Sequence, residues 1–181
     1  MRCLFFVLII TAFLSACNQP VKGRNGQVYK SAVQYNDYII GRQTTLIKNV
    51  LDLSAIAQTN LDSADKMLNK YVVETDSMII NLNGMPAYKD DSSFRDAAIA
   101  SFAFYKKIFG NEYKQLINIR KNGGDATEEG VAEMNRIVGD ITREEEKYDK
   151  AFHNAQKNFA DKNNMKLAEN EMQKKIDKIK E

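Results

Sequence analysis

The chain has 181 residues, of which 44% are hydrophobic and 28% charged, and its formal net charge is +2 at pH 7. This balance lacks the large basic excess of a nucleic-acid-binding protein, so we expect no nucleic acid partner. A chain of this length can bury about two thirds of its surface in one domain. Both cysteines, Cys3 and Cys17, lie near the N-terminus. We therefore expect an apolar core, and not disulfide bonds, to hold the fold together.

Residues 1–16 have the layout of a secretory signal peptide. Arg2 supplies a positive charge, residues 4–13 are apolar apart from Thr11, and small residues follow. The apolar core matches the roughly 7–15 residues of a signal peptide and is shorter than the about 20 residues that span a bilayer. We expect this segment to be removed from the mature chain.

The end of this segment, Leu14-Ser15-Ala16-Cys17, resembles the lipobox of bacterial lipoproteins. The resemblance implies cleavage before Cys17 and lipid attachment to its thiol. Several acyl chains, at roughly 0.8 kcal/mol per buried CH₂, hold a protein on a membrane durably. In that family the residue after the cysteine directs sorting, and Asn18 favours the outer membrane over the inner membrane. The alternative is an ordinary signal peptide whose cleavage site contains a cysteine.

The segment after the lipobox is polar and rich in chain-breaking residues. Residues 18–27 contain one proline and two glycines and few apolar residues, which is typical of a flexible linker. With Cys17 they form an expected tether over residues 17–27. Beyond it, proline occurs only at Pro86. The long proline-free stretches with helical periodicity predict an all-α domain over residues 28–162.

Apolar residues at three-and-four spacing predict four helices in this domain. The expected helices cover about residues 28–57, 61–82, 94–121 and 127–162. Asn60 is a good N-cap residue for the second helix, and Asp125 and Thr127 are both plausible N-caps for the fourth. Gly84 and Gly123 are typical of the positions just past a helix end.

Four apolar stripes joined by short connections predict an antiparallel up-down-up-down four-helix bundle. Residues 163–181 are expected to form a C-terminal tail with a short amphipathic helix, in which Met172, Ile176 and Ile179 share one side. The alternative architecture is an elongated three-helix coiled coil in which the last helix continues through Asn163.

Polar residues interrupt the apolar stripes and predict a buried polar layer. The candidate layer comprises Arg42, Thr75, Glu112, Arg136 and Glu145. Counting along antiparallel helices places Arg42 level with Glu145, and Glu112 level with Arg136, which predicts two ion pairs. In the structural interpretation, a buried polar pair fixes the register of the helices at some expense of stability. In the functional alternative, Arg42 and Glu145 line a polar pocket for a small ligand.

Two glycines lie inside the expected third and fourth helices. Gly110 and Gly139 each cost about 1 kcal/mol relative to alanine in a helix interior. They fall at nearly the same level, which predicts that the two helices approach each other closely there.

Few residues have the chemistry or spacing of a catalytic or metal site. His153 is the only histidine, and Lys150 occupies the position where a di-iron bundle has glutamate. Asp149 lies four residues before His153 and could complete a local pair of metal ligands. The sequence contains neither a glycine-rich phosphate loop nor a cysteine haem motif. We therefore predict a non-enzymatic protein without a cofactor or metal.

The lipobox, the tether, the four helices and the amphipathic tail together resemble the small helical surface or periplasmic lipoproteins of Gram-negative bacteria. This resemblance is one of architecture and implies an envelope location and a helical fold, but no activity. We expect a membrane-anchored envelope lipoprotein with an interaction or structural role, facing the periplasm or exposed at the cell surface. Its expected partners are the membrane, through the N-terminal lipid, and another envelope protein.

Overall fold

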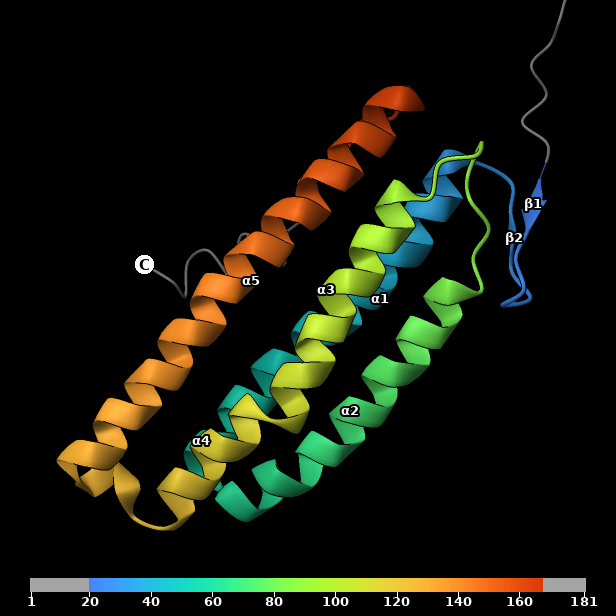
Figure 1. The fold of residues 1–181 in the computed structure, drawn as a ribbon. Coiled ribbons are helices and arrows are strands. Elements are labelled where there is room, and N and C mark those ends of the chain that lie inside the picture. The colour runs from blue at the N-terminus through green and yellow to red at the C-terminus, as the bar shows by residue number, and fades with distance from the viewer. Residues whose placement is uncertain (1–19, 168–181) are drawn as a thin grey trace, which may run out of the picture.

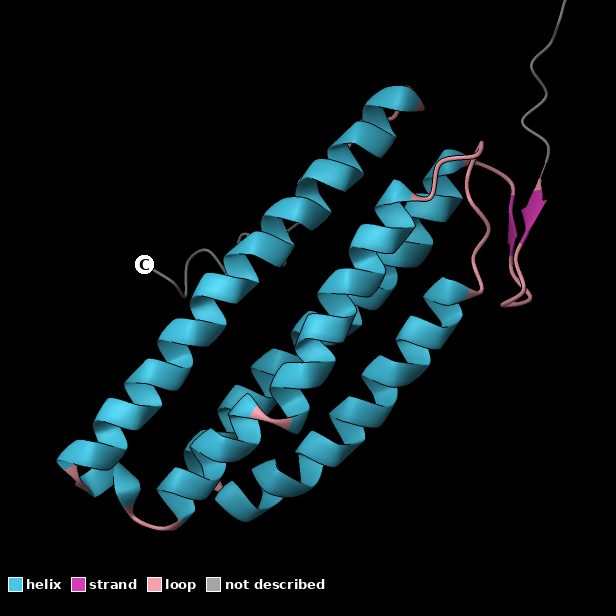
Figure 2. Cartoon of the chain, viewed as in Figure 1, coloured by secondary structure: helices cyan, strands magenta, loops and turns pink. Residues whose placement is uncertain are grey.

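Helices dominate the part of the chain that the computed structural model describes, residues 20–167 (Figure 1). The helical elements in this part are α1 (Ala32–Thr59), α2 (Leu61–Asn83), α3 (Ser93–Gly110), α4 (Glu112–Lys121), the 3₁₀ turn η1 (Gly124–Ala126) and α5 (Glu128–Lys162). Two short strands, β1 (Val21–Lys22) and β2 (Val28–Tyr29), precede them (Figure 2). The predicted all-α bundle is confirmed. The lipobox and residues 168–181 lie outside the described residues.

Capping side chains set the starts of three helices. Asn60 accepts a hydrogen bond from a backbone N–H in the first turn of α2 at 2.8 Å, and Thr127 does the same for α5 at 3.1 Å. Both predicted N-caps are therefore confirmed. The first helix begins at Ala32, later than expected, because Ser31 caps it and residues 28–29 belong to β2.

The segment expected to be a flexible tether forms, from residue 20 onward, a hairpin bonded to the bundle. β1 and β2 pair antiparallel, and Asn25 lies in the loop between them. Its Nδ2 donates to the hydroxyls of Tyr29 (2.7 Å) and Tyr38 (3.2 Å) and to the carbonyl oxygen of Asn81 (3.1 Å). The tether prediction is thus wrong for residues 20–27. The Asn25 side chain fixes this segment to the bundle by donating to acceptors on β2, α1 and α2.

Two glycines let the hairpin loop lie directly on the end of α2. The backbone N–H of Asn25 donates to the carbonyl oxygen of Gly84 at 3.2 Å. A Cβ atom on Gly84 would lie 2.8 Å from the Asn25 backbone nitrogen, and one on Gly23 would lie 2.8 Å from the Gly84 oxygen. Real Cβ contacts are not that short, so both positions require glycine.

The expected third helix is divided into α3 and α4. The break lies at Asn111, whose φ of −122° and ψ of −75° are not helical. Gly110, which ends α3, is nearest to Val72 of α2, at 3.8 Å from its ideal Cβ position, whereas Gly139 on α5 faces open space. The predicted close approach through these two glycines is therefore wrong. Counting gave their level correctly along the helices, but not the direction in which each position faces.

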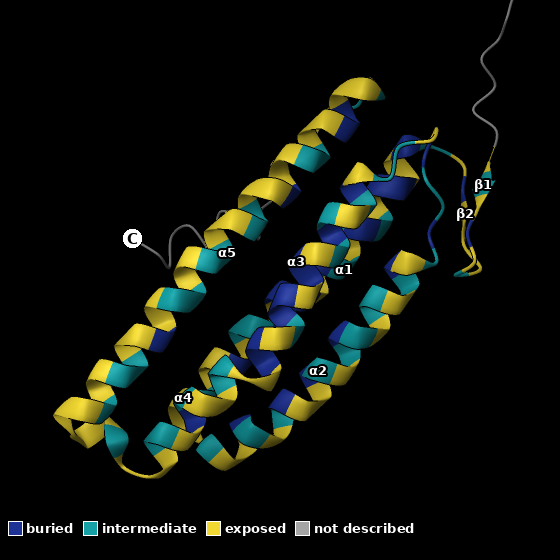
Figure 3. Cartoon of the chain, viewed as in Figure 1, coloured by how far each residue is buried: buried dark blue, intermediate teal, exposed yellow. Residues whose placement is uncertain are grey.

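α3 is the central helix of the bundle. It packs against α2 and α5, and α1 packs on α2 and α3 (Figure 1). The buried residues gather on the sides of the helices that face one another (Figure 3). Large aromatic side chains with less than 2% exposure fill this core: Tyr35, Tyr71, Phe94, Phe102, Phe109 and Phe152.

α1 and α5 contact each other near the hairpin end of the bundle. The rings of Tyr35 and Phe159 stack with centroids 5.3 Å apart, and Gln156 donates to Asn36 at 3.0 Å. At the opposite end, α1, α4 and α5 border an open cleft.

Candidate functional site

Arg42 lies on the side of α1 that faces α2. Its guanidinium carbon is 3.3 Å from the centre of the Tyr38 ring, and its Nη1 donates to the Tyr38 carbonyl oxygen at 3.0 Å. It also lines a surface depression between α1 and α2, together with Thr45 and Ser77. Arg42 therefore points away from α5, where Glu145 lies.

Glu145 instead binds to α3. The hydroxyl of Tyr105 donates to its Oε1 at 2.6 Å. Tyr105 is 8% exposed, and this burial, together with the Glu145 charge, raises the pKa of its hydroxyl far above the usual range. Glu145 sits in an apolar stripe because it accepts this hydrogen bond.

The structure therefore corrects the expected pairing of Arg42 with Glu145. Counting from the Asn36–Gln156 hydrogen bond places Arg42 level with about residue 150 of α5. The estimate from sequence was wrong by more than a helical turn. The ligand pocket expected around Arg42 and Glu145 does not form, since the two side chains contact different helices.

Thr75 is also not part of a polar layer shared between helices. Its side chain is fully buried, and its Oγ1 donates to the carbonyl oxygen of Tyr71, one turn earlier in α2, at 2.7 Å. A buried hydroxyl paired within its own helix needs no partner on another helix. Thr75 therefore contributes to core packing and not to a site shared with Arg42 or Glu145.

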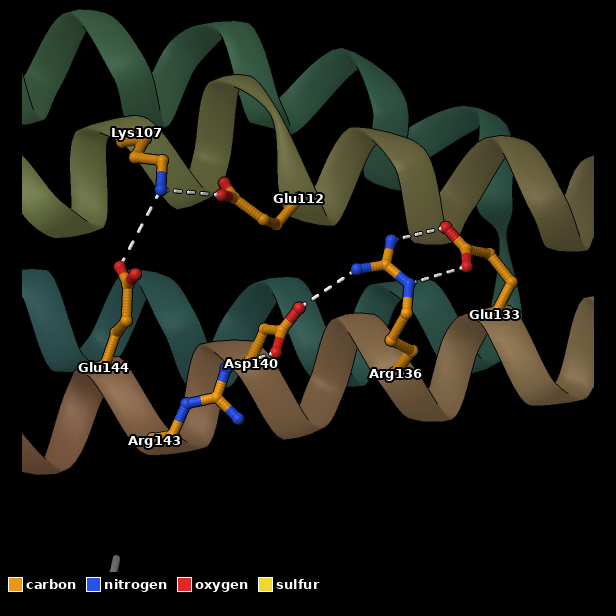
Figure 4. Close-up of polar contacts among 7 residues, drawn as sticks. All are labelled: Lys107, Glu112, Glu133, Arg136, Asp140, Arg143 and Glu144. Atoms are coloured by element: carbon orange, nitrogen blue, oxygen red, sulfur yellow. Dashed lines mark hydrogen bonds and ion pairs between the residues drawn. The ribbon is translucent and has the colours of Figure 1, made fainter.

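Glu112 and Arg136 do come together in one place, although they do not pair. Both line a depression of about 260 Å³ between α3–α4 and α5, which we call the polar groove (Figure 4). Its charged lining residues are Lys107, Glu112, Arg136, Asp140, Arg143 and Glu144. Lys107 Nζ lies 3.1 Å from Glu112 and 3.7 Å from Glu144, so it bridges α4 to α5.

The other cations of the polar groove are paired along α5. Arg136 makes two hydrogen bonds to Glu133, at 2.7 and 2.8 Å, and lies 3.0 Å from Asp140. Arg143 lies 2.5 Å from the other oxygen of Asp140. The predicted Glu112–Arg136 pair is thus replaced by Glu112–Lys107 and Glu133–Arg136, because each of these residues has an oppositely charged neighbour close to it in the sequence.

The charged side chains of the polar groove neutralise one another in ion pairs at the surface. Glu112 raises the pKa of Lys107 by hydrogen bonding, so the cation is retained at neutral pH. Exposed pairs of this kind contribute about 0–1 kcal/mol each. One atom departs from this pattern: Oε2 of Glu112 is buried and has no hydrogen-bond partner among the described residues. The groove mainly holds α5 against α3 and α4.

His153 contacts the backbone of Asp149, the residue that could complete a pair of metal ligands with it. Its Nδ1 lies 2.8 Å from the backbone oxygen of Asp149, one turn earlier in α5. Within residues 20–167, no three histidine, cysteine, aspartate or glutamate side chains are grouped to hold a metal ion.

Both α1 and α5 border a cleft of about 380 Å³ at the end of the bundle farthest from the hairpin. We call it the apolar cleft. Its apolar walls come from three helices: Val50 and Leu53 of α1, Tyr113 and Leu116 of α4, and Met134 and Val138 of α5. Val138 is 49% exposed. An exposed apolar patch in a concave site is typical of a surface that another molecule covers.

Polar groups border the apolar cleft and hold it open. Nη1 of Arg120, on α4, donates to the carbonyl oxygen of Ala57 at 2.8 Å, which ties α4 to the last turns of α1. Burial raises the pKa of the Tyr113 hydroxyl to about 12, so it stays neutral. The cleft is therefore formed by fixed helices and lined by uncharged walls, with a cation at its edge.

Sequence reasoning missed the apolar cleft. Met134 and Val138 follow the same three-and-four spacing as core residues, so the spacing does not indicate that they line an open cleft. The available signal was the change in the last helix from large aromatic residues near its C-terminus, Phe152 and Phe159, to smaller ones near its N-terminus.

Comparison of the chain with protein-family models, with curated proteins and with solved structures finds no match. None of the helices in residues 20–167 is both long and apolar enough to cross a membrane. Cys17, the expected site of lipid attachment, lies outside the described residues.

Proposed function

We propose that the chain is a cell-envelope lipoprotein, anchored to a membrane through Cys17, that binds a partner protein at the apolar cleft and catalyses no reaction. The lipobox Leu14-Ser15-Ala16-Cys17 supports the anchor. The observation that carries the binding role is the position of the apolar cleft, which lies at the end of the bundle opposite the N-terminal hairpin.

The hairpin would keep one end of the bundle close to the lipid. Four residue steps separate Cys17 from Val21, and at up to about 3.6 Å per residue they span at most about 14 Å. Asn25 bonds the hairpin to α1 and α2, so the bundle cannot swing freely on a long tether. The hairpin end of the bundle would therefore lie next to the membrane.

The apolar cleft would then face the aqueous space and not the lipid. α5 has 35 residues and is about 52 Å long, and the α5 residues of the cleft lie in its first turns. A site held several nanometres from the anchor suits a protein partner better than a membrane lipid. Apolar side chains inserted into a pocket of this kind typically carry most of the binding energy of a protein interface.

A second candidate, supported by the volume of the cleft, is binding of a small apolar ligand. Ligand pockets usually enclose about 300–1,000 Å³, and the cleft has about 380 Å³. This candidate takes the place of the ligand pocket that the sequence suggested around Arg42 and Glu145.

Photo-crosslinking in intact cells tests the proposed partner site. A photoreactive amino acid at Val138 should link the chain to one distinct protein, whereas the same residue at Val73, which is 65% exposed on α2, should not. Val138→Asp should abolish a link made from Met134, which also lines the cleft, and Val73→Asp should leave that link intact. Equal crosslinking from Val138 and from Val73 would contradict the partner site. A link to a small molecule would favour the second candidate.

Detergent-phase partitioning tests the anchor separately. The wild-type chain should enter the detergent phase, and Cys17→Ala should leave it in the aqueous phase or uncleaved. If both chains partition alike, the lipoprotein part of the proposal is wrong, whatever the crosslinking result.

A further inference from the structure

We propose that the outer face of the N-terminal hairpin binds the surface of a membrane that contains anionic lipids. We call this surface the basic face and define it by four exposed residues: Lys22 of β1, Arg24 in the loop, Val28 of β2 and Lys30, which follows β2. The choice of a membrane as the occupant rests on the anchor proposed above. The contact itself requires no lipid on Cys17, so it can be tested on a chain without that lipid.

The pairing of β1 with β2 gives the hairpin an inner and an outer side. Val21 pairs with Tyr29, and Lys22 pairs with Val28. Paired residues of antiparallel strands point to the same side, and successive residues of a strand point to opposite sides. Tyr29 is 2% exposed, and its ring contacts that of Tyr35 on α1 with centroids 5.2 Å apart. Lys22 and Val28 therefore point away from the bundle, at whose edge the hairpin lies (Figure 1).

The basic face combines an exposed apolar side chain with cations that have no carboxylate partner. Val28 is 45% exposed. Lys22, Arg24 and Lys30 are exposed, and none of them forms an ion pair within residues 20–167. Residues 20–36 contain neither aspartate nor glutamate, so the hairpin and the first turn of α1 supply no neutralising charge. Such a surface suits an anionic membrane, because lipid phosphates bind the cations and the apolar side chain enters the headgroup region.

The opposite end of the bundle carries carboxylates that an anionic surface would repel. Glu128 and Glu129 lie in the first turn of α5. Both are exposed, and neither has an ion pair in the part of the chain that the structure describes. An anionic membrane would therefore attract the hairpin end and repel the end with the apolar cleft. The proposed lipid at Cys17, four residue steps before Val21, favours a membrane over an acidic protein as the occupant of the basic face.

Vesicle flotation tests the role of the cations. The full-length chain with Cys17→Ala, which cannot carry the lipid, is mixed with vesicles of phosphatidylcholine or of phosphatidylcholine and phosphatidylglycerol. It should bind the anionic vesicles and not the neutral ones, and added salt should weaken the binding. Each cation near an anionic surface contributes about fivefold in binding, or about 1 kcal/mol. Lys22→Gln, Arg24→Gln and Lys30→Gln together should therefore weaken binding by about 100-fold.

A matched variant controls for the change in net charge. Lys48→Gln, Lys66→Gln and Lys114→Gln together remove the same charge from exposed positions on α1, α2 and α4. This control should bind the anionic vesicles nearly as well as the parent Cys17→Ala chain. Residues 1–16 are the same in all these chains, so a difference between the two variants reports on the basic face.

A tryptophan reporter measures the contact without removing any charge. The chain contains no tryptophan, so Val28→Trp in the Cys17→Ala chain supplies the only one. Its fluorescence maximum should move to shorter wavelength on anionic vesicles, because the side chain leaves water for the headgroup region. Val73→Trp is the matched control, at a position on α2 that is 65% exposed, and its maximum should not move.

Three results would overturn the membrane contact: equal binding of the parent chain to neutral and anionic vesicles, equal binding of the two charge variants, or equal shifts from Val28→Trp and Val73→Trp. None of them would count against the anchor or the partner site, because every chain compared lacks the lipid and keeps the residues of the apolar cleft. Conversely, if detergent partitioning rules out the anchor while the Val28→Trp shift is seen, the basic face stands as a reversible membrane contact.

Discussion

The hydroxyl of Tyr105 on α3 donates a 2.6 Å hydrogen bond to Oε1 of Glu145 on α5. This bond explains a glutamate in an otherwise apolar stripe, and it joins the central helix to the last one. Since Tyr105 is 8% exposed, most of its interaction with Glu145 is shielded from water.

Replacing Tyr105 by phenylalanine should destabilise the bundle by about 1–2 kcal/mol, because a shielded hydrogen bond to a charged acceptor is lost while the ring is kept. Urea unfolding at neutral pH measures the change. Tyr148→Phe is the matched control, because the Tyr148 ring stacks on Phe104 without a hydrogen bond to Glu145. Equal losses in the two variants would contradict this role of the Tyr105 hydroxyl.

A double-mutant cycle between Arg42 and Glu145 should give a coupling free energy near zero. Arg42→Leu should cost only about 1 kcal/mol, because it removes a half-buried cation–π contact with Tyr38 and leaves no buried charge without a partner. Its effect should add to that of Glu145→Leu within about 0.3–0.5 kcal/mol, as for sites that do not touch. A coupling well above that range would show that the two side chains meet in solution.

Asn25→Ala should release the N-terminal hairpin from the bundle. The Asn25 amide donates to acceptors on β2, α1 and α2, and unsatisfied groups of this kind cost about 1–3 kcal/mol. We expect faster hydrogen exchange in residues 21–29 with little change in α3. Arg24→Ala, at an exposed neighbouring position, is the control. If both variants exchange alike, the hairpin is held by something other than Asn25.

The ion pair between Asp91 and Lys162 should make stability depend on pH in the acid range. Lys162 at 2.6 Å and the backbone N–H of Ser93 at 2.9 Å hold the pKa of Asp91 well below its usual range. Its contribution is therefore complete above the unfolded-state pKa of about 4 and is lost as the pH falls further, through the lowered folded-state pKa.

Asp91→Asn isolates the ion pair, because asparagine can still accept the hydrogen bond from Ser93. At pH 7 the variant should be less stable by up to about 1 kcal/mol, and the difference should shrink toward pH 2. Urea unfolding at several pH values measures it. A difference that stays constant with pH would assign the effect to the turn and not to the charge.

The positions of the helices along the chain could be predicted from the sequence. Which neighbouring helix each side of a helix contacts could not. Periodicity and the caps Asn60 and Thr127 locate the elements, since both depend on local backbone requirements. Arg42 shows the limit: its position in the stripe is compatible with contact to α2 or to α5, and only the packing of large aromatic residues decides between them. An error of little more than one helical turn was enough to create a false ion pair.

The hairpin and the apolar cleft were missed for different reasons. The dipeptide Asn25-Gly26 is a turn signal, but it was outweighed by the glycine and proline content of the segment. The cleft has only a weaker signal, the loss of large aromatic residues toward the N-terminus of α5. It is lined by residues of α1, α4 and α5 that are far apart in the sequence, so spacing within one helix does not predict it.

The central position of α3 also bears on how the chain folds. α2 and α3 are consecutive and pack extensively on each other, so they can associate with little loss of loop entropy. We expect the transition state to contain this pair, with α5 and α1 docking on it afterwards. The hairpin can close only when the ends of α1 and α2 are in place. Substitutions in the α2–α3 contact should therefore slow folding, whereas those in the hairpin should mainly accelerate unfolding.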